Sequence, residues 1–264
     1  MKLEDKIIWI TGASSGIGRH FAEKANSEGA VCILSSRRKE ELEKVSSGLK
    51  HPKKSFVLPM DISHSDSIQE KTETVLGRFG KIDILLNNAG ISQRSLVLDT
   101  EISTYRKILE TDFFGNIALT KSVLPSMIRN GSGKITVISS AMGKIHTPLR
   151  SGYAAAKYAL HGFYDCLRDE IWNTGVKIQI VCPGFIRTNI SNTALLGDGT
   201  EQRKMDDALE NGMDAALFAE KLVSAVLSEK TELYIGGRKE RFAIFLNHYF
   251  PSLYGRIIRK IKVT

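Results

Sequence analysis

The sequence predicts an α/β protein in which helices cover both faces of a doubly wound, parallel sheet of about seven strands. Short apolar runs alternate with helical patterns along most of the chain. Parallel strands need this order, because each strand is joined to the next by a crossover. Neither a low-complexity linker nor a repeat of about 20–50 residues interrupts the alternation. A single domain over residues 1–264 is therefore expected.

Each predicted strand is a short run of apolar and β-branched residues bounded by glycine, proline or polar residues. The seven runs are residues 6–11, 30–36, 55–60, 83–90, 134–140, 176–184 and 232–237. Helical patterns cover about residues 15–27, 40–49 and 65–78, two stretches across 100–129, and the region around Tyr153. Ligands of such sheets bind beyond the carboxyl ends of the strands, so functional residues are sought there.

The composition is that of a globular protein with a large core, since 42% of the residues are hydrophobic and 25% are charged. The net charge of +8 is local: residues 238–264 hold seven Lys/Arg and one acid, and the rest is nearly neutral. No nucleic-acid partner is therefore predicted. No apolar run reaches the roughly 20 residues that span a bilayer, and no signal peptide is recognised, which favours a cytoplasmic protein.

The three cysteines are odd in number, far apart and embedded in apolar segments. Cys32, Cys166 and Cys182 are therefore expected to be core residues. No pair of cysteines or histidines has the spacing of metal ligands, so no metal site is predicted.

The first strand ends in TGASSGIG, where Gly12, Gly16 and Gly18 precede a helix. Glycines let backbone amides approach a phosphate closely, and the positive end of the helix favours an anion. The spacing differs from the G-x-G-x-x-G fingerprint. A phosphate-binding turn is the preferred interpretation, and a tight connection is the alternative.

The stretch SGYAAAKYALHGF places Tyr153 and Lys157 four residues apart, on one face of a predicted helix. An ammonium beside a phenol favours the ionised phenol, so such a tyrosine can exchange a proton near neutral pH. Because the chain has seven tyrosines, one such pair also arises readily by chance. Its interpretation depends on the other motifs.

The TGASSGIG turn resembles the TGxxxGxG signature of the short-chain dehydrogenase/reductase family. Other motifs of that family follow in register: Asp61-Ile62 after the third strand, Asn87-Asn88-Ala89-Gly90 after the fourth, Ile138-Ser139-Ser140 at the end of the fifth, and Pro183-Gly184 with Thr188 after the sixth. The match covers about residues 5–237. It implies a Rossmann-type fold, a nicotinamide dinucleotide cofactor, and hydride transfer between a carbonyl and a secondary alcohol.

The resemblance also implies catalytic roles. Tyr153 corresponds to the general acid/base, Lys157 supports its ionisation and holds the cofactor ribose, and Ser140 would bind the substrate oxygen. Ser139 is the alternative serine, but neighbouring strand residues face opposite ways, and Ser140 has the expected spacing of thirteen residues to the tyrosine. Tyr158 lies one residue off the active face and is expected to be a packing residue.

One position departs from the family pattern. The family carries an asparagine in an N-x-x-G element, where it positions a water that links the lysine to solvent. The stretch TDFFGNIALT places Asp112 in that slot, with Asn116 one turn further on. Asp112 is therefore a candidate catalytic residue, and a surface-facing helical aspartate is the alternative.

The end of the second strand favours NADP(H) over NAD(H). An acidic residue there would bind a ribose 2′-hydroxyl, but the chain has Ser36, Arg37 and Arg38, which suit a 2′-phosphate. A basic helix surface is the alternative, although cations are unfavourable at a helix start. The full predicted cofactor site is Gly12, Ser14, Ser15, Gly16, Ile17, Gly18, Ser36, Arg37, Arg38, Asp61, Ile62, Asn88, Ala89, Gly90, Tyr153, Lys157, Pro183, Gly184, Ile186 and Thr188.

The resemblance implies that residues 185–213 form the family's mobile substrate lid, and Leu195, Leu196 and Met205 within it suggest a lipophilic substrate. The stretches LTKSVLPSM, PGFIRTNIS and FPSLYGRIIRK resemble the dehydrogenase/reductase member 7 branch, which is similar to 11β-hydroxysteroid dehydrogenases. The alternative function is a non-catalytic, dinucleotide-binding regulatory protein on the same fold.

The tail, residues 238–264, holds five of the twenty aromatic residues and most of the net charge, and Pro251 is expected to interrupt any helix in it. Basic residues beside aromatic ones suit peripheral membrane contact, and packing against the pocket or an oligomer interface is the alternative. The family resemblance implies a homodimer or homotetramer that packs the helices around 113–127 and 153–172 against their symmetry mates, and apolar residues on more than one face of these stretches agree with it.

Overall fold

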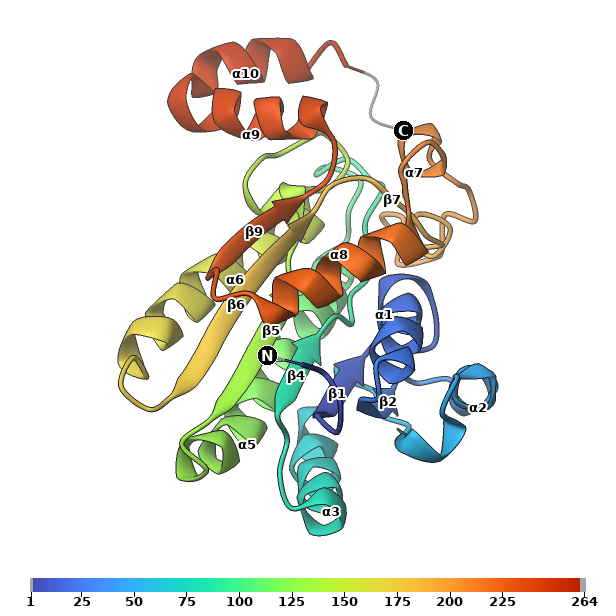
Figure 1. The fold of residues 1–264 in the computed structure, drawn as a ribbon. Helices are drawn as coiled ribbons and strands as arrows, with labels where there is room; N and C mark the ends of the chain where they lie inside the picture. Colours follow the sequence, from blue (N-terminus) through green and yellow to red (C-terminus); the bar gives the residue numbers. More distant parts are fainter. Residues whose placement is uncertain (1, 262–264) are drawn as a thin grey trace.

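The computed structural model describes residues 2–261. Seven parallel strands form one sheet in the order β3-β2-β1-β4-β5-β6-β9 (Figure 1). The strands are β1 (Ile7–Thr11), β2 (Val31–Ser35), β3 (Ser55–Val57), β4 (Ile84–Asn87), β5 (Gly133–Ile138), β6 (Val176–Pro183) and β9 (Glu232–Ile235). All seven predicted strands are present, and the predicted Rossmann-type α/β fold is confirmed.

The strand order reverses at β1. Ile10 lies opposite Leu34 of β2 on one side and opposite Leu86 of β4 on the other. The chain runs outward from β1 through β2 to β3, and then continues on the other side of β1 from β4 to β9. Such a reversal opens a crevice beyond the carboxyl ends of the two central strands.

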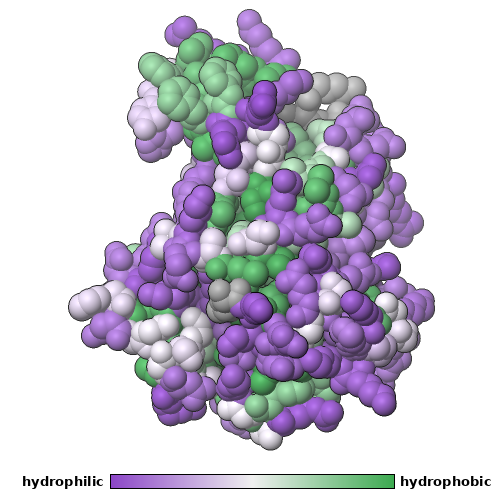
Figure 2. Space-filling view, in the orientation of Figure 1, coloured by the Kyte–Doolittle hydropathy of each residue, from purple (hydrophilic) through white to green (hydrophobic). Residues whose placement is uncertain are grey.

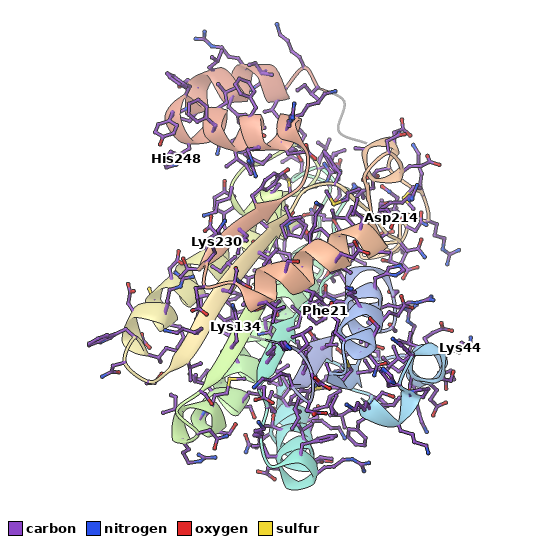
Figure 3. The ribbon with its side chains drawn as sticks, viewed as in Figure 1. Phe21, Lys44, Lys134, Asp214, Lys230 and His248 are labelled. Atoms are coloured by element: carbon purple, nitrogen blue, oxygen red, sulfur yellow. The ribbon has the colours of Figure 1, made fainter. Side chains whose placement is uncertain are left out.

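Helices cover both faces of the sheet, and alternate strand residues feed two apolar clusters. On one face, Ile8 packs with Phe21, which is labelled in Figure 3, and with Phe218. On the other face, Trp9 packs with Tyr164. The first face carries α1 (Gly16–Ser27), α2 (Lys39–Gly48) and α8 (Ala215–Leu227), and the second carries α3 (Ile68–Phe79), α5 (Gly115–Arg129) and α6 (Ser151–Glu170).

Most predicted helices lie where they were expected, but α8 was not predicted. Asp214, labelled in Figure 3, begins this helix, since its carboxylate accepts hydrogen bonds from the amides of Ala216 (2.9 Å) and Leu217 (3.3 Å). One cysteine prediction was wrong: Cys32 and Cys182 are buried, whereas Cys166 is exposed on α6. Three short 3₁₀ helices span Pro52–Lys54, Ser65–Ser67 and Ala141–Gly143.

The helical region predicted across residues 100–129 contains α4 (Ile102–Leu109), a π turn (Glu110–Phe114) and α5. A π turn inside a helix is rare and occurs often at functional sites. Asp112 lies in this turn and its side chain is fully buried. The alternative of a surface-facing aspartate is therefore wrong.

The segment predicted as a lid contains β7 (Ile186–Arg187) and α7 (Asp207–Glu210), and it ends at β8 (Met213–Asp214). β7 and β8 pair in a second, two-stranded parallel sheet. Between β7 and α7, Leu195 forms β-bridges with Gln93 and Glu201. The segment is thereby attached to the loop that follows β4.

The tail forms two packed helices, α9 (Arg238–Tyr249) and α10 (Pro251–Ile258), which lie at the top of Figure 1. Pro251 occupies the first turn of α10, where its missing N–H is tolerated, so the predicted interruption falls between the two helices. Residues 262–264 of the predicted tail lie outside the described residues. None of the helices within residues 2–261 is long and apolar enough to cross a membrane.

Candidate active site

A cavity of about 1460 Å³ lies at the carboxyl ends of the strands. It is lined by nearly all residues that the sequence predicts for the site, from the TGASSGIG turn to Thr188. Two predicted residues do not line it, namely Gly18 and Asp112. Both lie one layer behind the wall, Gly18 against the backbone of Gly12 and Asp112 behind Lys157.

The glycine-rich turn is shaped by backbone geometry that other residues would resist. Gly12 has φ of 67°, in the left-handed region that favours glycine. A Cβ on Gly18 would lie 2.6 Å from Asn88 Nδ2, too close for any side chain. The side-chain amide of Asn88 donates to the Thr11 carbonyl (2.9 Å), which ties the end of β4 to the end of β1. The turn therefore holds its backbone at the cavity wall, where α1 begins.

Ser36, Arg37 and Arg38 stand at the end of β2, beside the same turn. Both arginines are exposed, and Arg38 Nη2 donates to the hydroxyls of Ser14 (3.0 Å) and Ser15 (3.2 Å). Asp61, at another place on the cavity wall, accepts hydrogen bonds from the amide and hydroxyl of Ser63. Burial opposes ionisation of Asp61, but these bonds and the charge of Arg37 hold its pKa below the ordinary value. This corner of the cavity is rich in cationic and hydroxyl donors.

Tyr153 and Lys157 share one face of α6, and both are buried. Lys157 Nζ lies 5.5 Å from the centre of the Tyr153 ring, donates to the Ile138 carbonyl (3.2 Å), and lies 3.1 Å from Asp112 Oδ2. The other oxygen of Asp112 accepts the Ile91 amide (2.7 Å). Burial alone would lower the pKa of Lys157, but the charges of Asp112 and Tyr153 raise it above the ordinary value. Lys157 is therefore held as an ammonium beside the phenol.

The neighbouring candidate Asn116 does not face the lysine. Its amide donates to the backbone carbonyl of Asp112 (2.9 Å), within the helix. Tyr158, predicted to be a packing residue, is 42% exposed. Partial burial of its side chain raises the pKa of Tyr158, although a hydrogen bond with Asn247 of α9 acts in the opposite direction.

The two serines at the end of β5 have different surroundings. Ser139 also lines the cavity, but it is buried and its Oγ lies 3.0 Å from His161 Nε2, so its hydroxyl is already engaged. Ser140 is only partly buried, and its Oγ accepts the Met142 amide (3.1 Å), which leaves its proton free to donate. A hydroxyl that retains a donor at the cavity wall suits a ligand oxygen better than one already engaged.

His161 belongs to an array that the sequence did not reveal. Its Nδ1 lies 3.4 Å from Glu232 Oε2 on β9, and Lys144 Nζ lies 2.8 Å from the same carboxylate. Hydrogen bonding with His161 is the main reason that the pKa of Glu232 falls to about 2. The only hint in the sequence was that His161 lies two turns beyond Tyr153, on the same helix face.

A second array that was missed fastens the segment predicted as a lid. Asp206 is 1% exposed, and its Oδ2 binds two arginines that line the cavity. Arg94 donates to it through Nε (2.8 Å) and Nη2, and Arg150 through Nη2 (3.1 Å). Asp206 Oδ1 accepts from Gln202 (3.2 Å). Burial opposes ionisation of Asp206, yet Arg94, Gln202 and Arg150 hold its pKa below the ordinary value.

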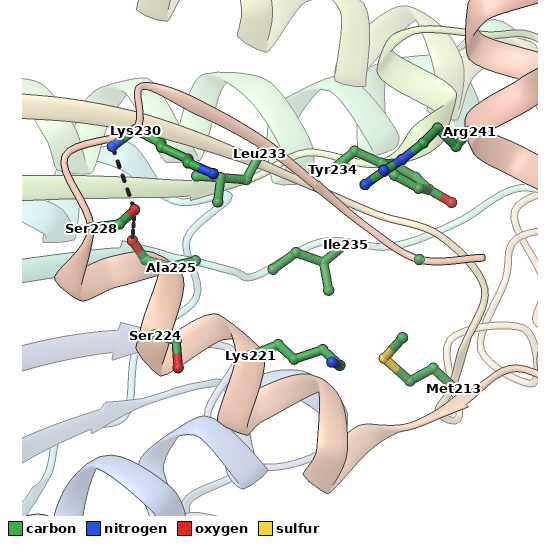
Figure 4. Close-up of a pocket in the computed structure, with 11 residues that line it drawn as sticks. Met213, Lys221, Ser224, Ala225, Ser228, Lys230, Leu233, Tyr234, Ile235 and Arg241 are labelled. Atoms are coloured by element: carbon green, nitrogen blue, oxygen red, sulfur yellow. Dashed lines mark hydrogen bonds between the residues drawn. The ribbon is translucent and has the colours of Figure 1, made fainter. Parts of the chain in front are cut away.

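A smaller cavity of about 480 Å³ lies between α8 and β9 (Figure 4). It is lined mostly by residues of these two elements, with Met213 and Arg241 from neighbouring segments, and by none of the predicted site residues. The Ser228 hydroxyl at its rim donates to the Ala225 carbonyl (2.8 Å), which satisfies the end of α8. It is separate from the cavity that holds Tyr153 and Lys157.

Comparison with known proteins gives a consistent result. The family model for short chain dehydrogenase matches residues 6–197. Dehydrogenase/reductase SDR family member 7B of Danio rerio is 38% identical over 263 residues, covering 97% of this chain and 85% of that protein. Family member 7 of Homo sapiens is 37% identical over 257 residues, covering 95% and 76%. A solved short-chain dehydrogenase from Streptomyces avermitilis superposes with a TM-score of 0.81 at 30% identity, covering 97% and 96%.

Proposed function

Because the chain belongs to the short-chain dehydrogenase/reductase family, we propose that it is an NADP(H)-dependent oxidoreductase that interconverts a lipophilic carbonyl compound and its secondary alcohol. The observation that carries this proposal is the meeting of Ser140, Tyr153 and Lys157 on one cavity wall with the glycine-rich turn. The non-catalytic alternative needs the turn but has no use for the three side chains together.

The cavity fits a dinucleotide and a second molecule at once. Its volume of about 1460 Å³ exceeds the roughly 300–1,000 Å³ of ordinary small-molecule pockets. The turn from Gly12 to Gly16 would hold the diphosphate at the start of α1, and Asp61 with Ile62 would border the adenine. When bound, the cofactor supplies or accepts the hydride.

The side chains of this chain then handle the substrate oxygen. Ser140 donates a hydrogen bond to it, and Tyr153 gives it a proton in the direction of reduction or removes one in the direction of oxidation. The phenolate left on Tyr153 is stabilised by the ammonium of Lys157, which Asp112 and the Ile138 carbonyl hold in place. Asp112 therefore supports Lys157 by direct contact, where the family places an asparagine and a water.

Preference for NADP(H) rests on residues of the second strand. Solved structures similar to this chain carry NAD in one case and NADP in another, so the fold alone does not choose between them. Ser36 stands where an acid would repel a 2′-phosphate, and Arg37 is exposed at the cavity wall, where it can bind one. Arg38 is engaged with Ser14 and Ser15, which leaves Arg37 as the main phosphate ligand.

The remaining features of the proposal concern the surroundings of the site. Apolar residues from the lid segment and the tail, including Phe185, Leu195 and Tyr254, line the cavity and favour a lipophilic substrate. A homodimer or homotetramer would cover the exposed apolar side chains on α5 and α6, such as Ile128 and Tyr158. A cytoplasmic protein with peripheral membrane contact through the tail completes the proposal.

A screen of lipophilic ketones, followed by loss of NADPH absorbance, tests the proposal. Tyr153→Phe should reduce turnover of any substrate found by about 10²–10⁴-fold, since only the transferable proton is lost. NADPH binding should survive, because the ring and the cofactor contacts remain. Near-normal turnover in this variant would refute the assignment.

The serine assignment has its own matched pair. Ser140→Ala should lower turnover strongly, whereas Ser139→Ala should lower it weakly, because the Ser139 hydroxyl is engaged with His161. The opposite order would exchange their roles. Binding of NADPH without turnover of any ketone, unchanged by all three variants, would favour the regulatory alternative.

A further inference from the structure

The two tail helices carry an unusual share of the exposed apolar surface. We call residues 238–261 the hairpin. Of the seventeen large hydrophobic side chains within residues 2–261 that are at least 38% exposed, seven lie in it: Phe242, Phe245, Tyr249, Phe250, Leu253, Ile257 and Ile261. Contiguous exposed apolar surface of this kind marks an interaction site. Figure 2 shows apolar side chains gathered over α9 and α10, with hydrophilic ones around them.

The exposed side chains form two stripes with helical spacing. Phe242, Phe245 and Tyr249 are three and four residues apart along α9, and the rings of Phe245 and Tyr249 touch with centres 4.9 Å apart. Leu253 and Ile257 continue the pattern on α10, and Phe250 lies between the two helices. The connection between the helices is therefore an apolar tip.

The inner face of the hairpin already has a partner. Leu246, Tyr254 and Ile258 are buried against Ala141 and Ile145, just after Ser140. The Tyr254 hydroxyl donates to the His146 carbonyl (2.7 Å), and Asn247 donates to the Lys144 carbonyl (2.9 Å). Tyr254 and Ile258 also line the large cavity. Closing the cavity thus accounts for the inner residues and for Ile261, which also lines it, and leaves the exposed side chains from Phe242 to Ile257 unexplained.

The charges of the hairpin are one-sided. Its six cations, which are Arg238, Lys239, Arg241, Arg256, Arg259 and Lys260, are all exposed. Its one acid, Glu240, is partly buried and accepts the Phe185 amide (3.3 Å). The two helices are joined by a short connection and pack against each other. The cations at the start of α9 and the end of α10 therefore lie at the end of the hairpin opposite the apolar tip, which we call the base.

We propose that the outer face of the hairpin docks on an anionic phospholipid bilayer, with the tip at the boundary of headgroups and acyl chains and the basic base among the headgroups. Aromatic and aliphatic side chains beside exposed cations have the composition that binds such surfaces. A second copy of the chain fits less well. A symmetric contact uses the same patch on both partners, and this patch has six exposed cations and no exposed acid to offset them, so the two copies would repel each other.

Docking would place one wall of the large cavity at the lipid surface. The same hairpin that faces the bilayer supplies Tyr254 and Ile258 to the cavity. On the proposed function, a lipophilic carbonyl compound would then enter from the bilayer rather than from water. This second step rests on the proposed oxidoreductase activity, whereas the docking deepens the proposed membrane contact and does not depend on that activity.

Sedimentation of the full chain with vesicles tests the docking without cofactor or substrate. Binding is expected to vesicles of phosphatidylcholine mixed with phosphatidylserine, to weaken at high salt, and to be much weaker for phosphatidylcholine alone. Phe250→Glu with Leu253→Glu should weaken it at least about tenfold, since each apolar side chain loses its burial in lipid. Arg256→Glu with Arg259→Glu should remove most of the preference for phosphatidylserine.

Trp172→Glu is the matched control, because Trp172 is 79% exposed but lies beyond the far end of α6. This variant should bind vesicles as the wild type does. Absent binding of the wild type, or full binding by both hairpin variants, would overturn the proposal. So would a change from oligomer to monomer in the Phe250/Leu253 variant, which would assign the tip to a contact between copies.

Activity separates this proposal from the proposed function. Phe250 and Leu253 do not line the cavity, so their variant should reduce a water-soluble ketone at the wild-type rate. The same variant should be slower with a ketone dissolved in anionic vesicles. Vesicle binding without any ketone reduction would refute the oxidoreductase and leave the docking in place, whereas reduction without vesicle binding would do the opposite.

Discussion

Two buried carboxylates lie beside the large cavity, each behind cations that form its wall. Asp112, in the π turn before α5, faces Lys157, and Asp206, in the segment predicted as a lid, faces Arg94 and Arg150. Both carboxylates are at most 1% exposed. The partners differ in one respect that decides the consequences: lysine can lose its proton when it is buried without a partner, whereas arginine cannot.

This difference separates a pair suited to chemistry from a pair suited to structure. The charge on Lys157 depends on Asp112, so the pair sets the charge that lies beside the ring of Tyr153. The charges on Arg94 and Arg150 are permanent, so Asp206 fastens the lid segment to the loops before α4 and α6. The lid predicted to be mobile thus has a buried ionic attachment.

The largest effect on stability is expected at Asp206. Asp206→Asn keeps the shape but leaves two buried guanidiniums without the charge they share, which should lower the free energy of unfolding by about 3–5 kcal/mol. Urea denaturation measures it. Because the pKa of Asp206 lies below the ordinary value, its contribution is present above pH about 3.9 and is lost as the pH falls through the lowered value.

Asp198→Asn provides the control for this prediction. Asp198 lies in the same segment but is exposed, and it accepts hydrogen bonds from the amide and hydroxyl of Thr200. Its replacement should change the free energy of unfolding far less than Asp206→Asn does. Equal effects of the two substitutions would show that the buried arginines do not depend on Asp206.

The sequence predicted one of these carboxylates and missed the other for a physical reason. Asp112 occupies a fixed position relative to Gly115 in a family motif, although its burial and its contact with Lys157 became visible only in the structure. Asp206 lies in a segment without periodicity, and its partner Arg94 is 112 residues away in the chain. Strand ends carry local signatures, whereas a contact between two irregular loops depends on the whole fold.

The second effect in size is expected at Asp112. Asp112→Asn removes the charge that raises the pKa of Lys157, and should lower the free energy of unfolding by about 1.5–3 kcal/mol at neutral pH. The stabilisation by charged Lys157 is complete below the ordinary pKa of lysine and is lost above the raised pKa of Lys157. The difference in unfolding free energy between Asp112→Asn and the wild type should therefore narrow as the pH rises through this range. For Asp206→Asn, the difference in unfolding free energy from the wild type should instead narrow as the pH falls.

Turnover distinguishes support of Lys157 from simple stability. Asp112→Ala should reduce kcat and move the pH profile of kcat, because the ionisation of Lys157 changes. Asn116→Ala, which removes hydrogen bonds to the backbone carbonyls of Thr111 and Asp112, should leave the pH profile in place. Identical profiles for both variants would make Asp112 a structural residue alone.

An exposed cation should behave unlike either buried pair. Arg37 is exposed, so Arg37→Ala should leave stability unchanged but weaken NADPH binding by about 1.5–3 kcal/mol, the contribution of a charge-assisted hydrogen bond. NADH binding should barely change. Arg38→Ala should weaken both cofactors alike, because Arg38 holds Ser14 and Ser15 of the phosphate turn. Fluorescence titration measures all four constants, and equal losses of NADPH and NADH in Arg37→Ala would refute a 2′-phosphate contact.

The smallest effect is expected at Glu232, whose carboxylate pairs with His161 and Lys144 but is 43% exposed. Solvent screens such a pair, so Glu232→Gln should lower the free energy of unfolding by no more than about 1 kcal/mol. The pKa of Glu232, about 2, lies below the ordinary value for a glutamate. Its contribution to the free energy of unfolding is therefore present above the ordinary pKa and disappears as the pH falls toward about 2. A double-mutant cycle with His161→Gln isolates the pair. A coupling as large as the Asp206 effect would show that partial exposure does not weaken an ion pair here, and would break the contrast between buried and exposed charges.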